Sequence, residues 1–172
     1  DESFEKLKIF NSKLDKDVFF AMSHGVHRGV LKKGKFDERE NFIKKLKKHT
    51  PNIKYDLYGM VENQPIWADN FINKISKSKM GLNLSQGNPV KYYSSDRFAQ
   101  IIGNGLLVLV DEKTRFSDFL GKNEIVTYKN IYDLAKKIIK YSKNDKLRRK
   151  IAKNGRNKSV SYTHLTLPTT DR

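Results

Sequence analysis

The strongest constraint on the fold is an unbroken apolar run at residues 106–110, Leu-Leu-Val-Leu-Val. A strand buried on both faces of a parallel sheet has such a run, whereas a half-exposed strand alternates apolar and polar residues. The run follows a short apolar stretch at residues 80–84, a polar loop, and a helical segment at residues 94–103 that ends in glycine. Strand, loop, helix and buried strand in this order predict a βαβ unit.

The rest of the chain repeats this alternation. Three further stretches are predicted to be strands, at residues 18–22, 53–58 and 124–128, and helical periodicity lies between and after them. Together they predict a doubly wound, Rossmann-like α/β fold: a parallel sheet of about five strands with helices on both faces. The alternating pattern of residues 53–58 indicates a strand near the sheet edge. Ligands of such sheets bind beyond the carboxyl ends of the strands, which here means the loop at residues 85–96.

Capping residues predict where the helices begin and end. Asp37 opens one helix, Thr114 is expected to cap a short one, and Asn130 precedes the most regular apolar periodicity in the chain. The last helix is predicted to start at Asn144 and to stop at Gly155, because glycine often ends a helix.

Three regions follow from these patterns. Residues 1–16 are expected to be a short helix or the remnant of a linker, and residues 17–158 to be the Rossmann-like domain. Residues 159–172 break the Lys-, Asn- and Ile-rich composition of the chain, so they are expected to be a non-native or disordered tail.

The chain is strongly basic, with a formal charge of +16 and a sequence pI of about 9.9. Such a charge favours nucleic acid, an anionic membrane surface or phosphorylated small molecules as partners. Of the 35 basic residues, 27 are Lys and 8 are Arg. A dedicated nucleic-acid binder more often concentrates arginine and interleaves aromatics on one face, so specific nucleic-acid binding is not expected.

Other function classes are limited by what the sequence lacks. It has no cysteine, which excludes disulfides and thiolate–metal sites, and the spacing of its histidines does not suggest zinc. No apolar run approaches the roughly 20 residues that span a bilayer. We therefore expect a cytoplasmic protein without a metal or other cofactor, at most peripheral at the inner face of the membrane. No dinucleotide fingerprint appears, which disfavours a dehydrogenase.

The segment around the predicted ligand loop resembles a known family. Ser95-x-Arg97-x-x-Gln100, a Gly-Asn-Gly turn and an apolar strand ending in Asp111 are similar to the C-terminal, donor-binding lobe of GT-B glycosyltransferases. The most similar group is the glycosyl transferase group 1 and spore-maturation-like set, and the order of elements matches over residues 15–158. Members typically carry glutamate where this chain has Gln100.

The resemblance implies a site for a nucleotide-sugar, whose diphosphate is held without a metal by basic side chains, backbone N–H groups and a helix N-terminus. The residues expected to bind the diphosphate follow the first and third strands: Ser23, His24, Gly25, Arg28, Lys91, Ser94, Ser95 and Arg97. Ribose, base or sugar contacts are expected from Gln100, Tyr92, Asp111 and Glu112. An alternative for Arg97 is a surface arginine that pairs with Asp96 or Asp111.

This reading predicts the donor-binding half of a hexosyltransferase-type enzyme of bacterial cell-envelope polysaccharide synthesis. Its expected partners are a nucleotide-sugar, a glycan or lipid-linked acceptor, and an N-terminal lobe of the same enzyme that carries any catalytic base. The chain alone is expected to bind donor weakly and to turn over little. The alternatives are a non-enzymatic basic α/β module that binds nucleic acid and, less favoured, a receiver-like regulatory domain.

Overall fold

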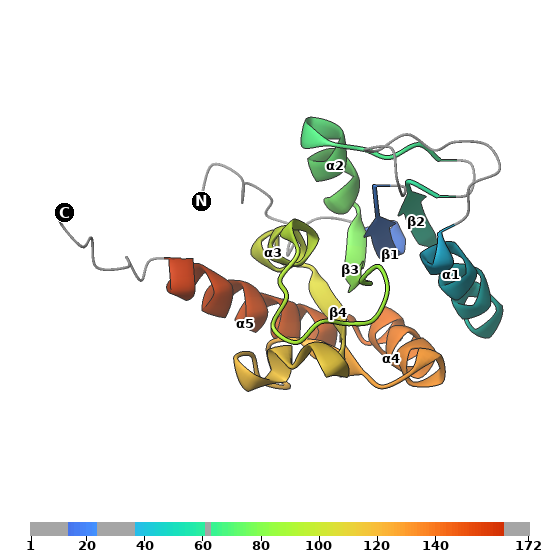
Figure 1. Cartoon of the computed structure of the whole chain (residues 1–172). Helices are drawn as coiled ribbons and strands as arrows, with labels where there is room; N and C mark the ends of the chain where they lie inside the picture. The colour runs from blue at the N-terminus through green and yellow to red at the C-terminus, as the bar shows by residue number, and fades with distance from the viewer. Residues whose placement is uncertain (1–13, 24–36, 61–62, 164–172) are drawn as a thin grey trace, which may run out of the picture.

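The computed structural model describes residues 14–23, 37–60 and 63–163 (Figure 1). At its centre is a five-stranded sheet in the order β2-β1-β3-β4-β5, in which every neighbouring pair is parallel. The strands are β1 (Lys16–Ala21), β2 (Tyr55–Tyr58), β3 (Ser78–Asn83), β4 (Leu107–Asp111) and β5 (Val126–Tyr128). The predicted doubly wound, Rossmann-like α/β fold is confirmed, and β2 is an edge strand as its alternating sequence indicated.

Helices cover both faces of the sheet (Figure 1). They are α1 (Glu38–His49), α2 (Ala68–Ile75), α3 (Asp96–Gly103), α4 (Ile131–Lys143) and α5 (Asp145–Thr163), with two short 3-10 helices, η2 (Glu112–Thr114) and η3 (Phe116–Asp118). α1 and α4 pack on one face and α2 and α3 on the other, while α5 packs against α3, α4 and β4.

The strands hold the two layers together because their side chains alternate between two cores. In β4, Leu107 and Leu109 join the core under α1 and α4, whereas Val108 and Val110 join the core under α2 and α3. All four are fully buried, and each contributes about 1.5–3 kcal/mol relative to an exposed position. This double burial explains the unbroken apolar run in the sequence.

Two helix starts near the carboxyl edge of the sheet are fixed by side-chain caps. The carboxylate of Asp37 accepts a hydrogen bond of 3.0 Å from the main-chain N–H of Arg39 and begins α1. The hydroxyl of Ser95 accepts from Phe98 N and begins α3, and it also donates to the Oδ1 atom of Asn83 at 3.0 Å. The second bond ties the start of α3 to the end of β3.

The predicted end of the last helix at Gly155 was wrong. α5 continues through Thr163, so the first residues of the expected tail, 159–163, are helical. A Cβ atom at Gly155 would lie 2.2 Å from the main-chain oxygen of Glu124. The glycine therefore serves a close helix–loop contact, and it does not end the helix.

The predicted cap at Thr114 was also wrong. Asp111 caps η2, since its carboxylate accepts from Lys113 N at 2.9 Å, while the Thr114 hydroxyl donates to the main-chain oxygen of Asp111 at 2.6 Å. The chain then reverses through Arg115 at a φ of 59° instead of forming one continuous helix. Asp111 therefore closes a turn through these two hydrogen bonds.

Candidate functional site

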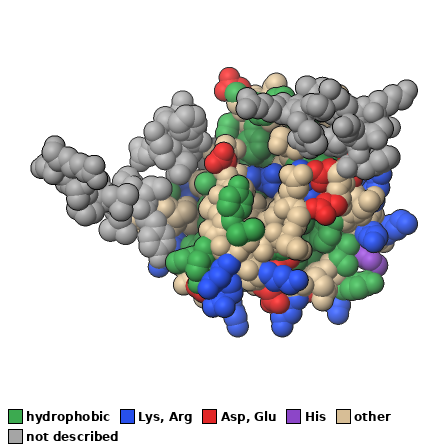
Figure 2. Space-filling model, in the orientation of Figure 1, with side chains coloured by type: hydrophobic (Ala, Val, Ile, Leu, Met, Phe, Trp, Pro, Cys, Tyr) green, Lys and Arg blue, Asp and Glu red, His purple; other side chains and the backbone are tan. Residues whose placement is uncertain are grey.

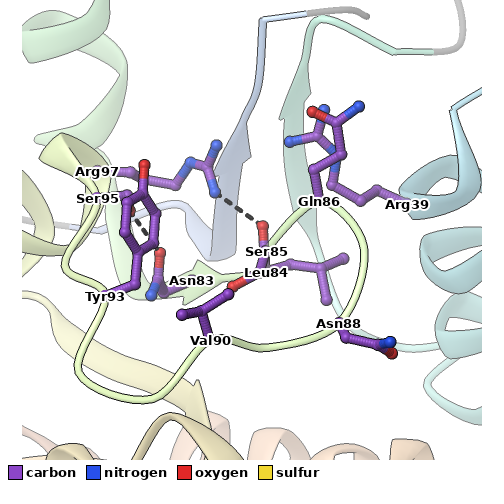
Figure 3. Close-up of a pocket in the computed structure, with 10 residues that line it drawn as sticks. All are labelled: Arg39, Asn83, Leu84, Ser85, Gln86, Asn88, Val90, Tyr93, Ser95 and Arg97. Atoms are coloured by element: carbon purple, nitrogen blue, oxygen red, sulfur yellow. Dashed lines mark hydrogen bonds between the residues drawn. The ribbon is translucent and has the colours of Figure 1, made fainter.

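A polar cavity of about 390 Å³ lies at the carboxyl end of β3, between the starts of α1 and α3 (Figure 3). We call it the first cavity. It is lined by Arg39, Asn83, Leu84, Ser85, Gln86, Asn88, Val90, Tyr93, Ser95 and Arg97. Amide and hydroxyl groups dominate this lining, and the guanidinium groups of Arg39 and Arg97 lie on opposite sides of it (Figure 3). The cavity lies at the carboxyl edge of the sheet, where a ligand was expected.

A second cavity of about 400 Å³ lies beside the first, at the carboxyl end of β1 between the starts of α2 and α3. Its lining is Ala21, Met22, Ser23, Ile66, Trp67, Ala68, Asp69, Phe71, Ile72, Asp96, Arg97 and Gln100. It is more apolar than the first, and Trp67 is 57% exposed there. Ala68 has a φ of 47°, a left-handed conformation that is uncommon outside glycine and is found more often at functional sites.

Among the residues that the structure describes, Arg97 is the only one that lines both cavities. Its Nη1 atom donates to the main-chain oxygen of Leu84 at 3.0 Å, and its guanidinium lies 5.0 Å from the centroid of the Phe20 ring. Within the described residues no carboxylate forms an ion pair with it, so the alternative of a surface pair with Asp96 or Asp111 is not realised. Arg97 thus presents a largely buried positive charge to both cavities.

Burial makes this charge unfavourable without an anion. Desolvation lowers the pKa of Arg97 to about 10, and the nearby positive charge of Arg39 acts in the same direction. A buried cation usually acquires a paired anion. An anionic ligand group between the cavities would supply that pair.

Arg39, in contrast, is held by a buried ion pair. Its Nε and Nη2 atoms donate to the two carboxylate oxygens of Asp37 at 2.8 and 2.6 Å, and both side chains are nearly inaccessible. Its Nη2 atom also donates a hydrogen bond of 3.3 Å to the main-chain oxygen of Ser23. The end of β1, the start of α1 and the first cavity are connected through this one side chain.

The loop between β3 and α3 is fastened at both ends. Near its start, the Glu38 carboxylate accepts a hydrogen bond from Gly87 N. Near its end, Tyr92 N donates to Thr114 O at 2.9 Å, and its hydroxyl donates to Asp118 at 2.8 Å. Tyr92 has a φ of 61°, so it turns toward η3 and leaves Tyr93 in the cavity wall.

The structure brings four of the expected site residues to the two cavities: Ser95 and Arg97 to the first, and Ser23, Arg97 and Gln100 to the second. Lys91, Ser94 and Tyr92 line neither, and the Lys91 ammonium lies 4.6 Å from the Tyr92 ring centroid. Asp111 caps η2, and Glu112 lines a separate cavity beside β5. His24, Gly25 and Arg28 lie outside the described residues.

Two cavity residues, Arg39 and Asn83, were not predicted, whereas Gln86, Asn88 and Tyr93 were predicted only as part of the ligand loop at residues 85–96. Arg39 stands in the charged sequence Asp-Glu-Arg-Glu, which is typical of an exposed helix start. Asn83 had a usable signal, because it is a polar residue at the carboxyl end of a buried parallel strand.

No group of three or more His, Asp or Glu side chains in the described part of the chain could hold a metal ion. No helix of the described residues is long and apolar enough to cross a membrane.

Comparison with known proteins gives a family. A family model described as glycosyl transferase-like matches residues 38–166. The fold is similar to that of the C-terminal domain of a glycosyl transferase group 1 family protein, LpcC, from Francisella tularensis, with a TM-score of 0.50 and 15% sequence identity. That similarity covers 74% of this chain and 63% of that domain, so the chain spans less than two thirds of the solved structure.

No curated protein matches the chain at a significant level. The family match nevertheless extends over well over half of the sequence and includes α1, all strands from β2 onward, and the whole of the loop and helix that carry Arg97. The resemblance drawn from Arg97, Gln100 and the strand that ends in Asp111 is therefore confirmed: the chain belongs to the glycosyl transferase-like family.

Proposed function

We propose that this chain is the donor-binding half of a glycosyltransferase and that it holds a nucleotide-sugar across the two cavities. The observation that carries the proposal is the position of Arg97, which is shared by both cavities and has no carboxylate partner among the described residues. A diphosphate at Arg97 would neutralise the buried charge and leave one end of the donor in each cavity.

The side chains that line the two cavities suggest which end of the nucleotide-sugar binds in which cavity. The second cavity combines Trp67, Phe71 and Gln100, which offer apolar and aromatic surface with one amide, as a nucleoside requires. The first cavity offers the amides of Asn83, Gln86 and Asn88, which suit the hydroxyl groups of a sugar. We therefore assign the nucleoside to the second cavity and a hexosyl group to the first.

Arg97 would also assist the chemistry. When the glycosidic bond breaks, negative charge grows on the diphosphate leaving group, and a preorganised guanidinium stabilises that charge more strongly than water does. Because Arg97 is already desolvated and held by Leu84 O, little reorganisation is needed. The acceptor, a glycan or lipid-linked saccharide of the cell envelope, and any catalytic base would be bound by a second lobe.

A direct test is calorimetric titration of the chain with UDP-, GDP-, ADP- and CMP-sugars and with the free nucleoside diphosphates. We expect one nucleotide to bind with one-to-one stoichiometry, and the same nucleoside without phosphates to bind much more weakly. If no nucleotide-sugar or nucleoside diphosphate binds at millimolar concentration, the donor-binding proposal is wrong.

Gln100 provides a second test, which separates the nucleoside from the phosphates. In the proposed pose its amide oxygen accepts from ribose hydroxyls. Gln100→Ala should therefore reduce the preference for a ribonucleotide over its 2′,3′-dideoxy analogue. An unchanged preference would place the ribose elsewhere.

A further inference from the structure

Charge is distributed unequally between the two helical layers. α1 and α4, which cover one face of the sheet, carry nine Lys and Arg and three Asp and Glu. α2 and α3, which cover the other face, carry two of each kind. A general excess of lysine in the chain would make both layers basic. The fold therefore places a net charge of +6 on the layer of α1 and α4 and no net charge on the layer of α2 and α3.

The excess lies on exposed positions of α1 and α4, two helices that pack against each other, and we call this surface the basic face. It consists of six exposed lysines: Lys45, Lys47, Lys48, Lys136, Lys140 and Lys143. On α4, the spacing of Lys136 and Lys140 by four residues aligns them with the 62%-exposed Tyr132. The Tyr132 ring lies 4.9 Å from that of His49, which joins the end of α1 to the start of α4.

The acidic side chains of α1 and α4 do not neutralise this surface. The two acids of α1 lie in its first turn, beside the first cavity, and the one acid of α4, Asp133, is paired with Lys137 at 2.8 Å. Figure 2 shows Lys and Arg side chains at the right of the molecule, where α1 lies, and along the lower border, which is formed by α4 and by the segment after β4. α5 extends the excess, with seven Lys and Arg against one Asp.

We propose that the basic face docks the protein on an anionic lipid bilayer. Its six cations are all lysines, which are compact ammonium charges on flexible stems that suit mobile, singly charged headgroups. The exposed Tyr132 adds an amphipathic ring of the kind enriched at membrane interfaces. A nucleic-acid surface would use arginine forks and several interleaved aromatics, which the basic face does not contain.

This placement leaves the cavities accessible. α1 begins at the first cavity with Arg39, and Lys45 follows six residues later, about 9 Å along the helix axis. The basic face therefore lies to the side of the carboxyl edge of the sheet, so a docked protein would keep its cavities open near the membrane surface. Docking does not depend on the proposed donor function.

The test is partition of the purified chain onto sedimented vesicles. We expect binding to vesicles of 30% phosphatidylglycerol in phosphatidylcholine at low salt, weaker binding as salt rises, and none to pure phosphatidylcholine. The variant Lys45→Glu, Lys48→Glu, Lys136→Glu and Lys140→Glu should lose at least about a hundredfold in partition, since each lysine near an anionic surface contributes about fivefold.

A matched control makes the same change in net charge away from α1 and α4: Lys74→Glu, Lys77→Glu, Lys91→Glu and Lys113→Glu. Its partition should stay within about fivefold of the parent chain. The milder glutamine versions of both sets repeat the comparison if a glutamate variant unfolds by circular dichroism.

Three results would overturn the proposal. The first is no binding of the parent chain to anionic vesicles. The second is an equal loss in both variant sets, which would make net charge and not the basic face responsible. The third is tighter binding to a DNA or RNA duplex than to vesicles at equal salt, with the same dependence on the basic face, which would assign this surface to nucleic acid.

Discussion

The Nη1 atom of Arg97 and the main-chain oxygen of Leu84 are joined by a hydrogen bond of 3.0 Å, which aims the guanidinium at the junction of the two cavities. Arg97→Ala should reduce nucleoside diphosphate affinity by about 1.5–3 kcal/mol, the usual range for a hydrogen bond to a charged group. Calorimetry measures this loss. Arg115→Ala is the control, because Arg115 is exposed, bonds to Asp118 and lines neither cavity; an equal loss in both variants would contradict the assignment.

Removing the charge of Arg97 should weaken ligand binding but should not lower the stability of the free protein. The desolvated guanidinium has no carboxylate partner among the described residues, so the free protein is destabilised by this charge. Arg97→Met keeps much of the volume and removes the charge. Its free energy of unfolding, measured with urea, should equal or exceed that of the parent chain while ligand affinity falls. A clear loss of stability would show that Arg97 is a structural residue.

Ligand binding should also weaken at high pH. Burial lowers the pKa of Arg97 to about 10, so the side chain is charged at neutral pH and loses its charge as the pH rises through about 10. The advantage of the parent chain over Arg97→Ala in nucleoside diphosphate affinity should thus be full near pH 7.5 and shrink toward pH 10.5. Taking the ratio of the two affinities cancels the titration of lysines elsewhere. A constant ratio across this range would rule out ligand pairing by Arg97.

The ion pair of Asp37 and Arg39 should contribute mainly to the free energy of unfolding. Their side chains are almost completely buried, and removing one partner of a buried ion pair costs about 3–5 kcal/mol. We expect Arg39→Ala to lose stability in this range in urea unfolding. Lys137→Ala breaks the half-exposed pair with Asp133 and should lose less than about 1 kcal/mol. Similar losses in the two variants would show that burial does not strengthen the first pair.

Gly155 lies inside α5, although the sequence pattern predicted that the helix ends there. Alanine is better than glycine inside a helix by about 1 kcal/mol, but a Cβ atom here would meet the Glu124 oxygen at 2.2 Å, and overpacking costs about 1–3 kcal/mol or more. We expect Gly155→Ala to lower the melting temperature. Gly121→Ala is the control, since its Cβ would lie 3.9 Å from the flexible Glu124 carboxylate. A stabilised Gly155→Ala variant would contradict the contact.

The fold was predictable because its signals are local. The apolar run of β4 and the periodicity of α4 each depend on neighbouring residues in the chain, and both elements were found. The end of α5 was missed because the role of Gly155 is decided by Glu124, 31 positions earlier, and no local pattern reports that contact. Thr114 was misassigned because it is the last residue of η2, where its hydroxyl donates to Asp111 O, and Arg115 in a left-handed conformation precedes η3.

The candidate site was only partly predictable for a related reason. Arg97 and Ser95 follow directly from the motif at the start of α3. Arg39 lies 58 positions before Arg97, and its burial depends on Asp37 turning back to pair with it. Tyr92 and Tyr93 are adjacent, and only the left-handed backbone at Tyr92 decides which ring reaches the first cavity.

The hydrogen bond from Arg39 to Ser23 O connects the start of α1 to the end of β1 at the wall of the first cavity. Fraying of the first turn of α1 would release Asp37, withdraw Arg39 from the cavity wall and free the end of β1 in a single event. Amide hydrogens in that turn should therefore exchange with deuterium more slowly once a nucleotide is bound, even where they lie beyond its reach. The first turn of α1 therefore has to be folded for the wall of the first cavity to be complete.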